Sequence, residues 1–316
     1  MSPTKRERTV LIVDIESGSV GAALARLVPG EPPKLFAEAR VALPIFTTLS
    51  SATLVREIEK TLRELLLHAS LVATRLRGHT HVSDMGVVSS ALVFLSPPWT
   101  SLTQHQKGLQ WEHEPSLVGE VRRAVEEVFG AVPTTFHAFG IAANHAANTL
   151  FQTQHTSLLC TMGGEVGELL LVDSGAIAGH ATIPLGQHMV LRTLQHHAGL
   201  SAQEARSALH LPAAHNEPLN VAAVHLAREF AAAAHELVGA RSVRGILVIA
   251  PEPAGEWFAQ ALACSPGSAD SLVELFPQGT TVRALHTHHL IPHLSAHAAV
   301  PDLLLMLEAL FAGKVY

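Results

Sequence analysis

The chain has 316 residues with 27 acidic and 21 basic side chains, a formal net charge of −6, and 48% of its residues are hydrophobic. The length predicts about two domains, and the apolar content excludes a largely disordered protein. The mild negative charge argues against nucleic acid as a partner, because binding to a phosphate backbone needs clustered lysine and arginine. The longest apolar runs are well short of the ~20 residues of a membrane span. Two cysteines, Cys160 and Cys264, are too few for a disulfide framework and favour a reducing, cytoplasmic setting.

The sequence contains 21 histidines but a single tyrosine. In a helix, His289, His293 and His297 would share one face, where imidazoles can hold a metal. Pro292 interrupts this segment, and no cysteine or acidic ligand is close in sequence. A solvated or partly buried histidine-rich surface is therefore favoured over a metal site.

The first half of the chain predicts a meander of strands followed by helices. Residues 9–15 form an apolar run whose tip carries Asp14, which is typical of a buried strand. Residues 20–24 are compatible with a helix start or a second strand, and residues 34–43 predict a further strand after a Pro/Gly turn. The elements expected next are a helix over 51–69, a buried strand over 89–99 ended by two prolines, a helix over 116–129, a strand over 134–138 and a helix over 140–150.

A second cycle of the same kind begins near residue 157. An apolar strand, a turn at Gly163 and Gly164, a second apolar strand and a turn at Ser174 and Gly175 follow one another. The later expected elements are a helix over 187–198, a helix opened by a capping box of Ser201 and Glu204, a helix over 221–239, a strand over 244–249, a helix over 255–263 and a final helix over 301–313 with Pro301 at its start. Two α/β halves that enclose a cleft suit nucleotide binding, because tight glycine turns let backbone N–H groups approach phosphates.

Three segments, 13–24, 158–186 and 245–262, resemble the phosphate-1, phosphate-2 and adenosine motifs of the actin-like ATPase superfamily. Within that superfamily the chain is most similar to the FtsA/PilM branch of bacterial cell-division and type IV pilus assembly proteins. The resemblance implies an α/β, actin-like (ribonuclease H-like) duplicated two-lobe fold with an interlobe cleft. It places the first lobe at residues 1–150 plus 291–316 and the second at 151–290. The space between Pro97 and Pro115 implies a reduced or missing 1C subdomain, because it is too short for a complete one.

The resemblance also implies a set of nucleotide-binding residues, with Asp14 in addition orienting the shell of a Mg²⁺ ion. Carried over residue by residue, the set is Asp14, Ser17, Gly18 and Ser19 in the first motif, Thr161, Gly163, Gly164 and Glu165 in the second, and Ala250 in the third. No catalytic residue is assigned.

Each motif departs from the family pattern. Glu16 stands where the family favours glycine, and a carboxylate ~4 Å from a phosphate would repel it by about 1–4 kcal/mol. Thr161 replaces an aspartate, and Gly167 replaces a threonine. Residues 250–253, Ala-Pro-Glu-Pro, replace a run of glycines, and prolines supply no N–H donors. The sequence therefore predicts a degenerate nucleotide cleft. Two alternatives stay open: the cleft binds ATP and Mg²⁺, or it binds neither.

The function that these features favour is an actin-like scaffold of the FtsA/PilM type. It would organise a membrane-associated pilus or division assembly through protein contacts, and the resemblance implies a cytoplasmic peptide of an inner-membrane protein as partner, with self-association left open. Two alternatives remain. One is an active polymerising actin homologue that binds Mg·ATP, and the less favoured one is a sugar-kinase-like phosphotransferase.

Overall fold

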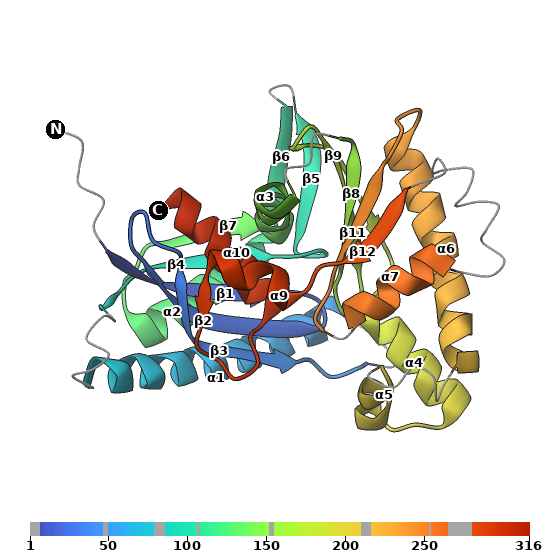
Figure 1. Cartoon of the computed structure of the whole chain (residues 1–316). Helices are drawn as coiled ribbons and strands as arrows, with labels where there is room; N and C mark the ends of the chain where they lie inside the picture. The colour runs from blue at the N-terminus through green and yellow to red at the C-terminus, as the bar shows by residue number, and fades with distance from the viewer. Residues whose placement is uncertain are drawn as a thin grey trace. The chain divides into compact units, whose positions relative to one another are not determined.

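The computed structural model describes residues 7–46, 50–78, 86–105, 108–151, 155–209, 216–252, 254–264 and 280–316. The chain forms two compact units, residues 1–146 with 287–316 and residues 147–286. Each unit is built around its own β-sheet (Figure 1).

The first unit contains a six-stranded sheet in the order β13-β3-β2-β1-β4-β7. Its first three strands form an antiparallel meander, and β4 and β7 then run parallel to β1. Residues 20–24, for which the sequence left two choices, lie in a strand. The bounds of the strands are β1 (Arg8–Ile15), β2 (Ser19–Leu27), β3 (Lys34–Ala42), β4 (Val88–Leu95), β7 (Thr134–Ala138) and β13 (Ser295–Ala296).

The two faces of this sheet are covered by different helices (Figure 1). Because side chains alternate along a strand, Leu11, Val13 and Ile15 of β1 point to one face, where they join a core with α1 (Ser51–Gly78) and α2 (Pro115–Phe129). On the other face, α10 (Leu303–Val315) packs against β1, β2 and β3. Asp14 therefore belongs to the face covered by α10.

The segment between Pro97 and Pro115 forms a small hairpin of its own. Strands β5 (Thr100–His105) and β6 (Gly108–His113) pair as a two-stranded antiparallel sheet. The sequence predicted neither strand.

The second unit repeats the strand order of the first. Its five-stranded sheet runs β10-β9-β8-β11-β12, with an antiparallel meander followed by two parallel strands, as in β3-β2-β1-β4-β7. The two halves of the chain are thus duplicates in topology. The bounds are β8 (Ser157–Met162), β9 (Gly167–Asp173), β10 (Ala176–Ile183), β11 (Gly245–Ile249) and β12 (Thr281–Ala284).

Most helices lie where the sequence patterns place them, although α1 runs to Gly78, beyond the predicted end at residue 69, and the helix predicted over 221–239 begins at Asn216. In the predicted capping box, Ser201 Oγ accepts from Glu204 N at 3.3 Å, and Ser201 N donates to Glu204 Oε2 at 2.8 Å. Helix bounds not yet given are α3 (Phe139–Phe151), α4 (Gln187–Ala198), α5 (Ala202–Ala208), α6 (Asn216–Val238), α7 (Ala254–Cys264) and α9 (Thr287–Leu290).

One local prediction was wrong. The final helix begins at Leu303 and Asp302 caps it, so Pro301 lies before the helix and not in its first turn. The histidine-rich segment is interrupted at Pro292, as the sequence indicated, because α9 gives way to a 3₁₀ turn at Ile291–His293 and then to β13. His289, His293 and His297 therefore share no helix face.

The described residues contain no group of three or more histidine, cysteine, aspartate or glutamate side chains that could hold a metal ion. Within the same ranges, no helix combines the length and the apolar character that crossing a bilayer requires.

Candidate functional site

The first predicted motif lies on the hairpin between β1 and β2. Asp14 pairs with Gly21 across the hairpin, Ser17 and Gly18 form its turn, and Ser19 opens β2. The turn is closed by Glu16 N, which donates to Ser19 O at 3.1 Å. Apart from Gly21, these residues were expected at this turn.

An arginine that the sequence analysis did not single out reaches this hairpin from β3. Asp14, Gly21 and Arg40 stand in one row across three adjacent strands. Arg40 Nη2 donates to Asp14 Oδ2 at 2.7 Å, and the side chain of Asp14 is fully buried. A Cβ atom at Gly21 would lie 2.8 Å from Arg40 Nη2. The glycine therefore provides the space through which the guanidinium crosses β2.

The same guanidinium joins the hairpin to the final helix. Arg40 Nε donates to Asp302 Oδ2 at 2.6 Å and Nη2 to Oδ1 at 3.1 Å, which is the two-bond geometry that arginine favours with a carboxylate. Asp302 Oδ1 also accepts from Leu305 N at 3.0 Å and so caps α10. Burial opposes ionisation of Asp302, but the positive charge of Arg40 and the hydrogen bonds from Arg40 and from the backbone N–H groups of α10 together outweigh it and lower the pKa of this carboxyl.

The hydroxyl of Ser19 is used twice. It accepts from Arg40 Nη1 at 2.7 Å and donates to Glu16 Oε1 at 2.6 Å. Glu16 is 3% exposed, and its burial raises the pKa of its carboxyl to about 7. The glutamate that replaces the family's glycine is thus turned to Ser19 and buried.

A further carboxyl lies beside Asp14 in the middle of α10. Glu308 is fully buried, and this burial together with the charge of Asp14 raises the pKa of Glu308 well above its usual range. Asp14 Oδ1 and both carboxyl oxygens of Glu308 receive no hydrogen bond from any described residue. Burial also raises the pKa of Asp14, although the charge and hydrogen bond of Arg40 oppose this rise, so both of these neighbouring carboxyls hold a proton more readily than free ones.

The second predicted motif lies on the turn between β8 and β9, in the second unit. Gly163 O accepts from Gln187 N at 2.9 Å, and Gly164 O accepts from His188 N at 2.8 Å, so the turn is bonded to the first N–H groups of α4. A Cβ atom at Gly186 would lie 2.3 Å from Gly163 O. Gly186 is therefore required for this contact, although the sequence analysis did not single it out.

The acidic side chain of that turn is held by two basic ones. Glu165 Oε2 accepts from Arg192 Nη2 at 2.7 Å, and Oε1 accepts from Arg192 Nη1 and contacts His188 Nδ1, each at 2.9 Å. Burial alone would raise the pKa of Glu165, but these bonds outweigh it and lower the pKa to about 2. Thr161, where the family has an aspartate, is buried and donates to Glu168 Oε2 at 3.3 Å.

The third predicted motif follows β11. Ala250 is 1% exposed, and Ala254 N donates to Pro251 O at 3.0 Å where α7 begins. Pro253 lies outside the described residues.

These side chains, as placed, do not fit a Mg²⁺ ion with a nucleotide. Mg²⁺ needs carboxylate, phosphate and water oxygens in near-octahedral geometry. Asp14 Oδ2 is bound by Arg40, and the Ser19 hydroxyl is bound by Arg40 and Glu16. Glu165, the acid that could replace the missing aspartate, is bound through both oxygens by Arg192. The positive charge that a metal would bring to Asp14 is already supplied by Arg40.

Sequence reasoning missed three residues of the cluster around Asp14: Arg40, Asp302 and Glu308. The apolar run of α10 contained a signal for Glu308, because it is the single acidic residue within LLLMLEALFAG. A lone carboxyl in a fully apolar helix indicates a buried partner.

Neither a protein-family model nor a curated protein matches the sequence. Solved structures do match. A structure entitled PilM–PilN type IV pilus biogenesis complex covers 99% of this chain and 97% of its own, with a TM-score of 0.60 at 13% identity. The ethanolamine utilization protein EutJ from Carboxydothermus hydrogenoformans covers 98% and 92%, with a TM-score of 0.55 at 13% identity.

A third match is a ROK family glucokinase from Streptomyces griseus in complex with glucose and AMPPNP. It covers 98% of this chain and 100% of its own, with a TM-score of 0.53 at 13% identity. The chain has the actin-like ATPase fold. The predicted α/β actin-like fold is thereby confirmed, and a PilM structure is among those that share it. At 13% identity the likeness establishes the fold of the chain.

Proposed function

We propose that this protein is an actin-like scaffold of the PilM type, which organises a membrane-associated assembly through protein contacts and has a degenerate nucleotide site. The proposal rests on one observation, the ion pair between Arg40 and Asp14 on the first hairpin. It includes the assignment of residues 1–150 with 291–316 as the first lobe and 151–290 as the second.

Separating Asp14 from Arg40 has an energetic cost. Removing one partner of a buried ion pair costs about 3–5 kcal/mol. This is the upper limit for moving Arg40 away from Asp14, because a metal bound to Asp14 would itself compensate the carboxylate. Each 1.4 kcal/mol is about tenfold in a dissociation constant, so this cost would weaken a micromolar nucleotide site at most to about the millimolar range. The same ion pair would have to break for Asp14 to orient a Mg²⁺ shell.

The activity side of the proposal is tested by ATP turnover in the purified protein and in Asp14→Asn. We expect no turnover that depends on Asp14, and any trace activity should be equal in both proteins. Turnover that disappears in Asp14→Asn would favour the active actin homologue instead. The glucokinase match makes glucose-dependent turnover the matched assay for the phosphotransferase alternative.

The partner side of the proposal is supported by the PilM–PilN structure, in which a protein of this fold occurs in a type IV pilus biogenesis complex. We infer a partner of the membrane-assembly kind, bound through its cytoplasmic peptide, which would place this protein at the inner membrane. Fluorescence anisotropy with labelled cytoplasmic peptides of inner-membrane proteins encoded beside it should give saturable binding to one peptide and none to its scrambled version. Sedimentation velocity over a range of concentrations tests self-association.

A further inference from the structure

A pocket of about 400 Å³ lies in the second unit, away from the predicted motifs of that unit. It is at the amino-terminal ends of three adjacent parallel strands, where Ser157 opens β8, Gly245 opens β11 and Thr281 opens β12. Gly163 and Ala250, by contrast, follow the carboxyl ends of β8 and β11. The pocket and the predicted nucleotide residues of this unit are therefore at opposite ends of the same strands.

The strand register builds the floor of the pocket. Ser157, Gly245 and Thr281 stand in one row across β8, β11 and β12. A Cβ atom at Gly245 would meet nothing nearer than Thr281 Oγ1 at 3.7 Å, so the glycine leaves open space between two hydroxyls. The next row on this face, Leu159, Leu247 and Arg283, adds an apolar surface beside a cation.

A buried hydroxyl in the floor has no partner. Ser157 is 9% exposed, and its Oγ makes no hydrogen bond to any residue in the described part of the chain. Leaving a buried polar group without a hydrogen bond is unfavourable. An acceptor atom of a bound molecule would remove this cost.

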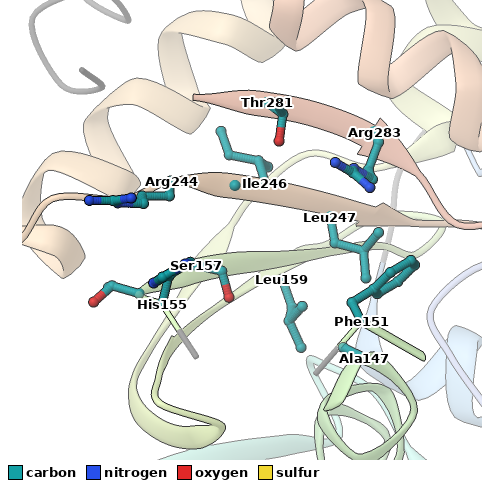
Figure 2. A pocket seen from close by; sticks show the side chains of 12 residues that line it. Ala147, Phe151, His155, Ser157, Leu159, Arg244, Ile246, Leu247, Thr281 and Arg283 are labelled. Carbon is teal, nitrogen blue, oxygen red and sulfur yellow. The ribbon is translucent and has the colours of Figure 1, made fainter. Parts of the chain in front are cut away.

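Two cations line the same pocket. The Arg244 and Arg283 side chains form no ion pair or side-chain hydrogen bond with any described residue, and the guanidinium of Arg283 lies 5.9 Å from the centre of the Phe151 ring. No acidic side chain is among the described residues that line the pocket. Its electrostatic character is therefore positive, with one apolar side that includes Phe151 and Leu247 (Figure 2).

Figure 2 shows the Arg244 and Arg283 side chains at opposite ends of the pocket, with Arg283 beside Phe151 and Leu247. We propose that this pocket binds a small organic anion, whose carboxylate or phosphate group pairs with Arg283 and whose second polar group accepts a hydrogen bond from Ser157. The apolar body of the ligand lies against Leu247 and Phe151. The volume falls within the range of about 300–1,000 Å³ that is usual for small-molecule sites, and arginine is suited to both kinds of anionic group. The inference does not depend on the scaffold role proposed above.

The test uses 8-anilinonaphthalene-1-sulfonate, an aromatic anion whose fluorescence rises on binding, with the full-length protein. We expect saturable one-to-one binding that weakens at least tenfold in the double variant Arg244→Gln and Arg283→Gln. Arg241→Gln, which removes an exposed arginine outside the pocket, is the matched control and should change the affinity less than twofold. Equal affinity in the wild type and the double variant would overturn the proposal.

Two further measurements keep the test decisive if the double variant folds poorly. Gly245→Leu fills the floor of the pocket from within and should abolish binding, while thermal unfolding followed by circular dichroism reports that the fold is retained. The uncharged dye N-phenyl-1-naphthylamine should bind the wild type at least tenfold more weakly than the sulfonate. Equal binding of the two dyes, or full binding to a folded Gly245→Leu variant, would contradict an anion site.

Competition identifies the anionic group. Displacement of the dye by phenyl phosphate but not benzoate assigns a phosphate ligand, and the reverse assigns a carboxylate. Displacement by neither would overturn the proposal. Because Mg·ATP binding is measured separately, a failure here is distinguishable from a failure of the proposed scaffold role.

Discussion

Arg40 Nη2 and Asp14 Oδ2 lie 2.7 Å apart, although one strand of the sheet separates the two residues. Asp14 is the residue that the actin-like resemblance assigns to the Mg²⁺ shell, and here its partner is a cation from the chain itself. Arg40 also binds Asp302, so the pair connects the first hairpin with the helix at the end of the chain.

Gly21→Ala should lower the free energy of unfolding by about 2 kcal/mol or more, because the new methyl group would meet an arginine that two carboxylates hold in place. Urea unfolding measures the change. Gly119→Ala in α2 is the control, since nothing lies within 4 Å of its Cβ position, and it should stabilise the protein by about 0.5–1 kcal/mol. Equal effects of the two substitutions would contradict the close approach of Arg40 to Gly21.

Arg40→Met should lower the free energy of unfolding by about 3–5 kcal/mol, because it leaves buried carboxylates without a cation. The comparison is Arg123→Met, whose ion pair with Glu120 is on the surface and should contribute less than about 1 kcal/mol. Chemical denaturation of both variants gives the difference. Similar small losses would show that Arg40 does not neutralise the cluster.

Glu16→Gln should change the pH dependence of stability in a defined direction. Burial raises the folded-state pKa of Glu16 to about 7 from its ordinary value of 4.5, so the native state is penalised as pH rises through this window. The variant should match the wild type near about pH 4.5 and exceed it by up to about 3 kcal/mol near about pH 8. Unfolding curves across this range provide the measurement, and a difference that does not vary with pH would refute the buried, shifted carboxyl.

Gly186→Ala should disrupt the turn between β8 and β9 and lower stability by more than about 3 kcal/mol, because its methyl group would overlap backbone oxygens that cannot move independently. Gly255→Ala in α7 is the matched control, since its nearest contact, Ala250 O at 3.6 Å, is ordinary. Thermal unfolding of both variants checks the ranking. A stable Gly186→Ala variant would be inconsistent with the packing of this turn on α4.

Much of the fold was predictable because local patterns agree with it. The strand over 134–138 and the helix over 187–198 have the bounds that their apolar spacing and turn residues indicated. The short strand β12, which pairs in parallel with β11, was not predicted. A four-residue strand provides too few alternating positions for its pattern to be recognised.

The cluster around Arg40 could not be predicted, because it depends on a bulge. Ala22 and Leu24 of β2 pair with Ala39 and Phe36 of β3, so β3 has one extra residue in this interval. The bulge contains Ala37, whose φ is 54°. An extra residue reverses which side chains face which side of a strand, so this bulge decides that Arg40 stands opposite Gly21. Asp302 is separated from Arg40 by 262 residues, and no local pattern connects them.

Isothermal titration of the wild-type protein with Mg·ATP tests most directly whether Arg40 has taken the place of the metal beside Asp14. We predict no saturable heat at nucleotide concentrations up to the millimolar range. Magnesium-dependent binding with a micromolar dissociation constant would contradict this account, because it would require Asp14 to exchange Arg40 for a metal shell without the expected loss of affinity.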